Sequence, residues 1–537
     1  MEALQHGREG LARGPGGEPH GHDVGKHVDR LDLARGKEST RDLGGGTRAD
    51  RLRCARESLV ALAGEGAVEL EAAHAGVGRG ETLHRDGLTH AAEISQRGRT
   101  AVRSGRGAAR RAEHGPMVTP PSDLEAFGAA AKKFLDAHAE RKEPAAAFRW
   151  GEGSDNVSMF EERSRAAEEE IVGAAKAWRT TKYDAGFGWI SGPSEYGGAG
   201  LSAAHERAYH RLESQYKVAN QSVFQIGLGM VAPTILAHAS PAARERYLRA
   251  LWRAEIVACQ LFSEPGAGSD LASLQMKAER DGDEWVITGQ KVWTSGAHYS
   301  DIGEIVCRTD PGMPKHKGIT AFIVDMKAPG VDVRPLRQMT GGASFNEVFF
   351  NEVRVADDMR LGDVNGGWAV ALTTLMNERA AIGTMSGGDV GMYVRAQAMA
   401  RHLGVADDPL VRDRLADVWI RGKVAGYNNQ RAMDKIRAGQ TPGPEMSISK
   451  MALVDNQRRL NEFVALVLGP RLQADTGEWG TYAWSQLVLG APGMRIAGGS
   501  DEVMRNIVGE RVLGLPKDVG IDATSPFRDL KVGTQKA

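Results

Sequence analysis

Aromatic residues are absent from the first 116 residues of this chain, although the full 537 residues contain 10 Trp, 9 Tyr and 13 Phe. Glycine, arginine and histidine recur there instead, in clusters such as RGPGGEPHGH and RSGRGAARRAEHG. A segment that cannot bury aromatic surface has little to offset its chain entropy. We therefore expect residues 1–116 to be a disordered leader or a mis-assigned start, with Met117 as the true first residue.

Cysteine, long apolar runs and net charge are also scarce. The three cysteines, Cys54, Cys259 and Cys307, lack the spacing of a metal site, which predicts free thiols in a reducing compartment. No run of about 18 uncharged apolar residues occurs, so we expect a cytoplasmic protein without a membrane span. The formal net charge is -1, and the basic run over residues 97–111 lacks aromatic residues for base stacking. These features argue against a nucleic-acid partner.

Hydrophobic periodicity divides the rest of the chain into three blocks. Apolar residues recur every three or four positions over residues 117–255, which predicts helices, with Ser240-Pro241 as a helix start. Over residues 256–367 the period falls to two, in stretches such as DGDEWVITGQKVWTSG that predict a compact antiparallel sheet. Helices return over residues 368–522, and residues 523–537 form a tail. The expected class is α+β.

Two glycine-rich stretches could hold a ligand. In QLFSEPGAGSDLASL, Pro265 bends the chain, and Ser263, Ser269 and Asp270 offer polar side chains beside free amides. Such a corner taken alone more often serves only as a turn between strands. The second stretch, QIGLGMVA, matches a dinucleotide-binding fingerprint but lies between helical patterns, without a βαβ unit. Its glycines are better explained by close packing of helices or of a ligand tail.

Several motifs in order resemble one family. SEPGAGSDL is followed by GDEWVITGQKVWTSG, with EYGGAGLS before them and LMNERAAIG and GGSDEVMRNIVGERVLGLP after them. Over about residues 122–522 the chain resembles the acyl-CoA dehydrogenases. The resemblance implies a helical N-terminal domain, an antiparallel β-barrel-like middle domain and a C-terminal four-helix bundle. It also implies an FAD enzyme that oxidises acyl-CoA to 2,3-enoyl-CoA, works as a homodimer or homotetramer and passes electrons to an electron-transfer flavoprotein.

The resemblance also assigns site residues. Seven positions match residues that bind the flavin, namely Gln260, Phe262, Ser263, Trp293, Ser295, Ser500 and Glu502. Ser269 matches the entrance for acyl-CoA. Trp293 alone would suit an ordinary core position, but its pairing with the SEPGAGSD corner favours a place over the flavin.

The position of the catalytic base departs from the commonest pattern. Thioester oxidation needs a carboxylate aimed at Cα, and many relatives carry it in a Tyr-Glu-Gly-Thr stretch where this chain has Ala497-Gly498-Gly499-Ser500. In the isovaleryl-type and long-chain-type branches the base comes from a Glu-Arg pair that matches Glu378-Arg379. Glu378 lies on an apolar helical face, which should desolvate it and raise its pKa. The alternative for Glu378 is a structural partner of an arginine.

The remaining predictions concern the substrate and two departures. Gly498 would donate its amide to the thioester carbonyl, and Arg379 would orient Glu378 or line the acyl-CoA channel. ARHLG and Leu468-Gly469-Pro470 depart from two family motifs that contact a neighbouring subunit's FAD. Two other functions therefore stay open: a catalytically silent subunit of a hetero-oligomer, and a flavin monooxygenase on the same fold.

Overall fold

The structure is a computed structural model. It describes residues 118–143, 148–158, 163–385, 390–437, 443–444, 446–517 and 524–531, all within one compact unit, Ala67–Ala537. The predicted leader, residues 1–116, and Met117 lie outside the described residues, as does Cys54. Cys259 and Cys307 are buried free thiols, as expected. Among the described residues, every helix is too short or too polar to span a bilayer.

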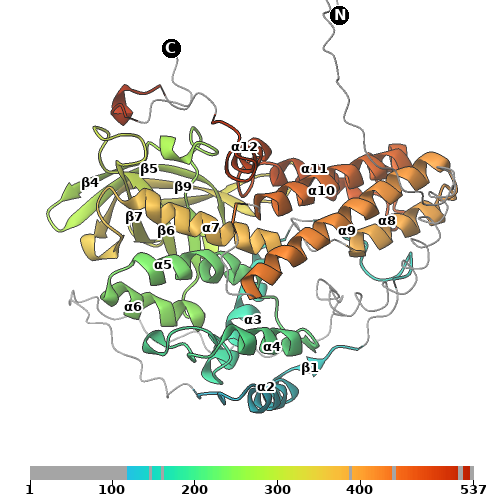
Figure 1. Cartoon of the computed structure of the whole chain (residues 1–537), viewed down its shortest axis with the longest axis horizontal. Helices are drawn as coiled ribbons and strands as arrows, with labels where there is room; N and C mark the ends of the chain where they lie inside the picture. Colours follow the sequence, from blue (N-terminus) through green and yellow to red (C-terminus); the bar gives the residue numbers. More distant parts are fainter. Residues whose placement is uncertain are drawn as a thin grey trace, which may run out of the picture. The chain divides into compact units, whose positions relative to one another are not determined.

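The N-terminal region is mainly helical, as the periodicity predicts (Figure 1). Its helices are α2 (Leu124–His138), α3 (Arg165–Asp184), α4 (Ala203–Glu213), the π-helix η4 (Gly227–Val231), α5 (Ala232–His238) and α6 (Pro241–Trp252). Ser240 caps α6 by accepting a hydrogen bond from the Ala243 amide, and Pro241 occupies the first turn, as predicted. The periodicity did not predict one detail of this region. Two short strands, β1 (Glu140–Arg141) and β2 (Tyr216–Lys217), pair antiparallel there.

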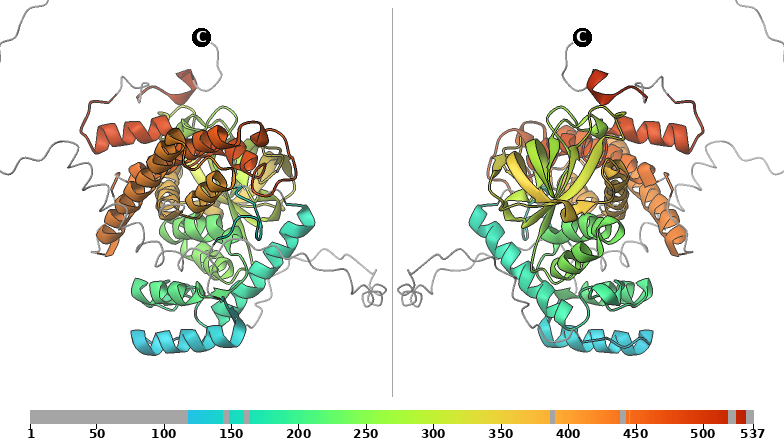
Figure 2. Two further views of the ribbon diagram at one scale, coloured as in Figure 1. Left: turned by 90° about the vertical axis from the view of Figure 1, so that its right-hand side faces the viewer. Right: turned by 90° about the vertical axis from the view of Figure 1, so that its left-hand side faces the viewer.

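A single eight-stranded sheet fills the middle region (Figure 2). Its strands are β3 (Ala258–Leu261), β4 (Lys277–Asp281), β5 (Glu284–Ser295), β6 (Ile302–Arg308), β7 (Ile319–Asp325), β8 (Val331–Leu336), β9 (Phe345–Ala356) and β10 (Arg360–Leu361). They follow the order β10-β7-β6-β4-β5-β9-β8, and β3 pairs with β6. The barrel-like prediction is not confirmed, because the strand order does not close on itself. The pairs β3–β6 and β4–β6 are parallel, so the sheet is not wholly antiparallel.

Helices return after the sheet. They are α7 (Gly367–Met385), α8 (Val390–His402), α9 (Pro409–Arg437), α10 (Met446–Leu468), α11 (Trp484–Met494) and α12 (Asp501–Arg511). Helices α8 to α11 share an apolar core around Met399, Phe463 and Trp484, while α7 and α12 both pack against α10. Helix α7 also packs against β7, η4 and α5, which fixes it beside the sheet.

The EYGGAGLS loop needs glycine for a steric reason. Gly197 has φ +90°, and its carbonyl accepts a 2.6 Å hydrogen bond from the Tyr183 hydroxyl. A Cβ atom at Gly197 would lie 2.4 Å from that hydroxyl oxygen. The left-handed backbone and the close approach both exclude a side chain.

Gly197→Ala should therefore lower the free energy of unfolding by more than about 1 kcal/mol. Gly173 is the matched control, because it lies inside α3 and a Cβ atom there would meet nothing within 4 Å. Gly173→Ala should raise the free energy of unfolding by about 0.4–1 kcal/mol. Urea titration of both variants measures the difference, and equal midpoints would contradict the steric argument.

Candidate active site

A buried ion pair fixes the SEPGAGSD corner. The Glu264 carboxylate accepts hydrogen bonds from the Gln275 amide (2.7 Å) and the Met276 amide (3.0 Å). It also pairs with Lys291 Nζ at 2.8 Å. Lys291 is fully buried and donates a second hydrogen bond to the Phe262 carbonyl at 3.0 Å. The corner therefore holds one shape, because every charged atom that it buries has a partner.

Trp293 lies immediately beside this corner. The Val292 amide donates to the Ser263 carbonyl at 2.9 Å, which ties the start of the corner to the residue before the indole. Trp293 sits in a bulged part of β5 with φ +61°, and its side chain is 57% exposed. The indole lies edge-on to the Phe345 ring, with centroids 5.7 Å apart. A bulky residue held exposed in a left-handed backbone is typical of a functional site.

The groups around the indole fit a flavin. Thr294 Oγ1 is buried and has no hydrogen-bond partner among the described residues. Within the same part of the chain, the hydroxyls of Ser263 and Ser295 also make no hydrogen bond. A flavin ring needs a flat apolar surface on one face and hydrogen-bond donors along its edge. The exposed indole and these hydroxyls supply both.

The other predicted residues of the corner lie in different surroundings. Gln260 on β3 is partly buried, whereas the Phe262 side chain is 5% exposed and packs in the apolar core. Phe262 can therefore face a ligand only through its backbone. Ser269 is exposed at the outer edge of the corner, next to Asp270, which pairs with Lys315 Nζ at 2.5 Å.

Helix α7 carries the predicted base. Glu378 is partly buried and lies one turn after Thr374, which is fully buried. The Thr374 hydroxyl donates to Glu304 Oε1 at 2.6 Å, and Glu304 on β6 pairs in register with Gln260 on β3. This contact joins the helix of Glu378 to β6, the sheet neighbour of the strand β3 that leads into the corner. The Arg379 side chain lies outside the described residues.

The turn before α12 holds three further predicted residues. Gly498 has φ +67°, which suits glycine, and Ser500 caps α12 by accepting a hydrogen bond from the Val503 amide at 3.3 Å. Glu502 is exposed and lies 3.7 Å from Arg505. In the described part of the chain, no hydrogen bond or ion pair joins these three residues to the corner. Their roles toward flavin and thioester stay predictions.

QIGLGMVA is not a dinucleotide loop. Its glycines lie in the π-helix η4, and the described residues around them form helices rather than a βαβ unit. A Cβ atom at Gly227 would lie 3.3 Å from the Ala258 amide nitrogen, so this glycine allows close packing on the strand β3, whereas the sequence predicted packing of helices or of a ligand tail. Gly229 faces open space instead. π-Helical turns often occur at functional sites, and this one packs against α7.

Comparison with known proteins identifies the family. The sequence matches the acyl-CoA dehydrogenase N-terminal domain over residues 155–255, the middle domain over 259–353 and the C-terminal domain over 365–513. It is 39% identical over 356 residues to the acyl-CoA dehydrogenase IpdE1 of Mycobacterium tuberculosis, covering 65% of this chain and 90% of that protein. The chain belongs to the acyl-CoA dehydrogenase family. As members of this family are oxidoreductases, the protein is an enzyme of that class.

Solved structures of acyl-CoA dehydrogenases share the fold. The Tcur3481-Tcur3483 steroid ACAD is 27% identical with a TM-score of 0.55, covering 67% of this chain and all of that one (100%). The ChsE4-ChsE5 complex from Mycobacterium tuberculosis is 25% identical with a TM-score of 0.53, covering 67% of this chain and 100% of that one. The helical, sheet and helical order of this acyl-CoA dehydrogenase is therefore the order of its family.

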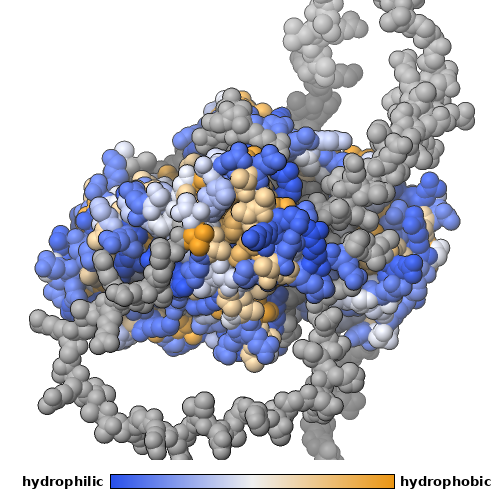
Figure 3. Space-filling model, turned by 90° about the horizontal axis from the view of Figure 1, so that it is seen from below, coloured by the Kyte–Doolittle hydropathy of each residue, from blue (hydrophilic) through white to orange (hydrophobic). Residues whose placement is uncertain are grey.

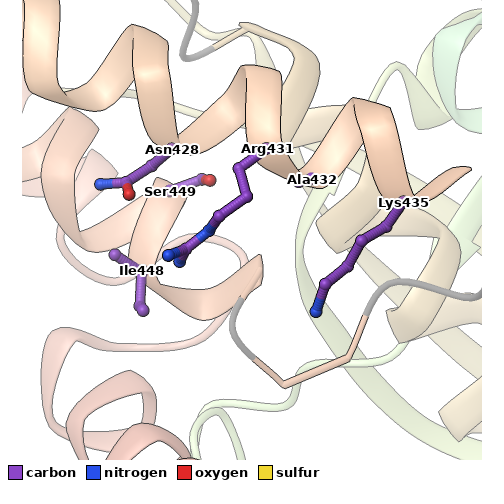
Figure 4. A pocket seen from close by; sticks show the side chains of 6 residues that line it. All are labelled: Asn428, Arg431, Ala432, Lys435, Ile448 and Ser449. Atoms are coloured by element: carbon purple, nitrogen blue, oxygen red, sulfur yellow. The ribbon is translucent and has the colours of Figure 1, made fainter.

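A separate hollow between α9 and α10 does not belong to this site (Figure 4). It is open to solvent and lined by Asn428, Arg431, Ala432, Lys435, Ile448 and Ser449. None of these residues was predicted to bind flavin or acyl-CoA. The Arg431 and Lys435 side chains extend from α9 toward the start of α10, so the hollow is basic rather than apolar.

Sequence reasoning missed four residues of this acyl-CoA dehydrogenase that shape the site: Glu264, Lys291, Glu304 and Thr374. Lys291 and Glu304 were detectable in part, because each is a charged residue within an apolar strand pattern. Their partners were not, because the ion pair and the Thr374 contact join segments that are far apart in the sequence.

Proposed function

We propose that this protein is an FAD-dependent acyl-CoA dehydrogenase that converts an acyl-CoA thioester to the 2,3-enoyl-CoA, with Glu378 as the base. The observation that carries the proposal is the exposed Trp293, held in a left-handed backbone beside the corner with its unused hydroxyl groups. When bound, FAD would supply the two-electron acceptor for the oxidation. Family membership supports the cofactor and the substrate class.

The residues divide the chemistry between them. Trp293 would cover one face of the flavin, and the hydroxyls of Ser263 and Ser295 would donate to its edge. Glu378 removes the α-proton, and the contact of Thr374 with Glu304 holds its helix to β6, which neighbours the strand that leads into the corner. The Gly498 amide polarises the thioester carbonyl, since removal of the α-proton places negative charge on that oxygen. By the family pattern, Ser269 and Arg379 would contact the acyl-CoA, and Ser500 and Glu502 would contact the flavin nucleotide.

Anaerobic mixing of the purified protein with a panel of acyl-CoAs tests this function. The panel holds straight, branched and steroid-ring thioesters, the last because one solved relative is described as a steroid ACAD. We expect yellow protein whose flavin absorbance bleaches with at least one member, together with formation of enoyl-CoA. Colourless protein would favour a silent subunit, and bleaching only by an external reductant would favour a monooxygenase.

A second subunit is a specific alternative to a homo-oligomer. Apolar side chains recur every three or four positions on the outer side of α9, at Ile420 (50% exposed), Val424 (52%) and Tyr427 (68%). Figure 3 shows the molecule from below the view of Figure 1, and apolar residues also gather in the middle of that face. Exposed apolar surface of this kind is typical of protein interfaces. Because two solved relatives are complexes of two named chains, we propose that α9 contacts another acyl-CoA dehydrogenase subunit.

Light scattering gives the subunit count of the chain expressed alone. A homodimer or homotetramer that is yellow and bleaches with acyl-CoA would support the homo-oligomer. A colourless monomer would support the hetero-oligomer. Electron transfer from the reduced protein to an electron-transfer flavoprotein, which we propose as the acceptor, is measured by adding that protein after bleaching.

A further inference from the structure

Glu304 is a carboxyl group in an unusual place. It lies within β6, is fully buried, and is surrounded by apolar residues of the core such as Ile302 and Val306. No cation among the described residues pairs with it, and its Oε2 atom has no hydrogen-bond partner. Burial penalises the charged form and raises the pKa of Glu304 to about 8, against a smaller lowering effect of the Thr374 hydrogen bond. The carboxyl group is therefore neutral at pH 7.

Glu304 belongs to a polar cluster that joins three elements. Thr374 on α7 donates to Glu304 Oε1 at 2.6 Å and lies 2.9 Å from the hydroxyl of Thr234 on α5. The Thr234 hydroxyl in turn lies 2.9 Å from the Met230 carbonyl of η4. All three polar side chains are fully buried. Apolar packing alone is non-directional, whereas a buried hydrogen bond fixes which side of a helix faces the sheet.

Helical geometry connects this cluster to the site. Residues four positions apart lie on the same face of a helix, about 6 Å apart along its axis. Glu378 therefore projects from the same side of α7 as Thr374, one turn closer to the end of the helix. A rotation of α7 by one residue would turn Glu378 away by about 100° and would leave Glu304 and Thr374 buried without each other.

We propose that Glu304 and Thr374 form a positioning contact that fixes the rotation of α7 and thereby aims Glu378 at the substrate. This rests on the proposed function, because it takes Glu378 to be the base. Glu304 does not touch the substrate in this proposal. It acts through Thr374, and a neutral group of the same shape serves as well.

The groups facing Glu304 keep it neutral. Its neighbours in register are Gln260 on β3 and Ile323 on β7, and Thr234 faces the cluster from α5. The ionisable group of α5, His238, points instead to the Thr373 hydroxyl at 2.8 Å, and burial lowers its pKa. Glu304 is thus the one ionisable group of this cluster, in the described part of the chain, whose charge changes near pH 8.

Four variants test the proposal kinetically. Glu304→Leu and Thr374→Val should each lower kcat by on the order of tenfold to a hundredfold, because a general base that is out of position removes the α-proton more slowly. KM and flavin content should stay within about twofold of the parent. Glu304→Gln should recover most of the rate, since its amide can still hydrogen-bond to Thr374. Thr373→Val is the matched control, because it removes a hydroxyl of the same helix that bonds to His238 instead. It should keep the parental rate.

A second measurement does not depend on activity. The folded pKa of about 8 lies above the ordinary 4.5, so the folded state holds a proton that the unfolded state releases over this window. The stabilising effect of that proton is complete below pH 4.5 and is lost as pH rises to about 8. As pH rises across this window, the urea midpoint of Glu304→Gln should therefore increase relative to that of the parent. Above about pH 8 the difference between the two midpoints should stay constant. Hydrogen exchange of the α7 amides should quicken in Thr374→Val but not in Thr373→Val.

The outcomes separate this proposal from the function on which it rests. If the parent protein bleaches with acyl-CoA but Glu304→Leu and Thr374→Val keep its kcat, the positioning role is wrong. A loss of kcat that only follows lost flavin or lost folded protein would make the cluster merely structural, which also overturns the proposal. If the parent does not bleach with any acyl-CoA, the proposed function fails. The hydrogen-exchange measurement is independent of that result. Unchanged exchange of the α7 amides in Thr374→Val would show that the contact does not restrain the helix.

Discussion

Replacing Glu378 with glutamine should lower kcat for acyl-CoA oxidation by about a hundredfold or more, because a lost general base costs that much in most enzymes. Flavin content should stay the same, since Glu378 lies on α7 and not among the residues around Trp293. Binding of acyl-CoA should also persist, because glutamine has nearly the same shape. The measurement is the rate of flavin bleaching in anaerobic stopped flow at saturating substrate.

Glu279→Gln provides the control for this experiment. The substitution makes the same type of change in an exposed carboxylate, because Glu279 is 65% accessible and pairs with Lys277 on the surface of β4. Its bleaching rate should equal that of the parent. A Glu378→Gln rate within about tenfold of the parent would remove Glu378 as the base, because a general base contributes more than that. The glutamate would then be a structural partner, as the alternative interpretation of the sequence held.

The sequence predicted the elements well and their three-dimensional pairing poorly. Periods of three to four and of two mark helices and strands because they reflect which face of each element is buried. The period says nothing about which strand lies beside which, so the open sheet, the parallel pairs of β6 and the small β1–β2 pair were not foreseen. These features depend on contacts between distant segments.

The candidate site shows the same division. The corner and Trp293 were found because both lie in short motifs, and the hydrogen bond between Val292 and Ser263 explains why they lie together. The left-handed backbone of Trp293 follows from a register shift in β5, which no local pattern reveals. Ser500 proved to be a helix cap, a role that Ser before an acidic first turn also predicts. A motif match alone did not separate that role from flavin binding.

The ion pair beneath the corner should matter more for stability than any other single contact described above. Lys291→Met should lower the free energy of unfolding by about 3–5 kcal/mol, because it leaves the Glu264 charge buried without its cation. The variant also leaves the Phe262 carbonyl without its donor, so flavin content should fall. Lys327→Met is the control, since Lys327 is 73% exposed and pairs with Asp301 at the surface. That loss should cost less than about 1 kcal/mol.

A double variant shows whether the buried charge is the cause. Glu264→Gln removes the charge and keeps an oxygen that can accept one of the two amide hydrogen bonds from Gln275 and Met276. Glu264→Gln combined with Lys291→Met should therefore be more stable than Lys291→Met alone, because no unpaired charge stays buried. Urea unfolding of the set at constant pH gives the coupling free energy. If Lys291→Met costs no more than Lys327→Met, the pair does not hold the corner, and the fixed placement of Trp293 beside it needs another cause.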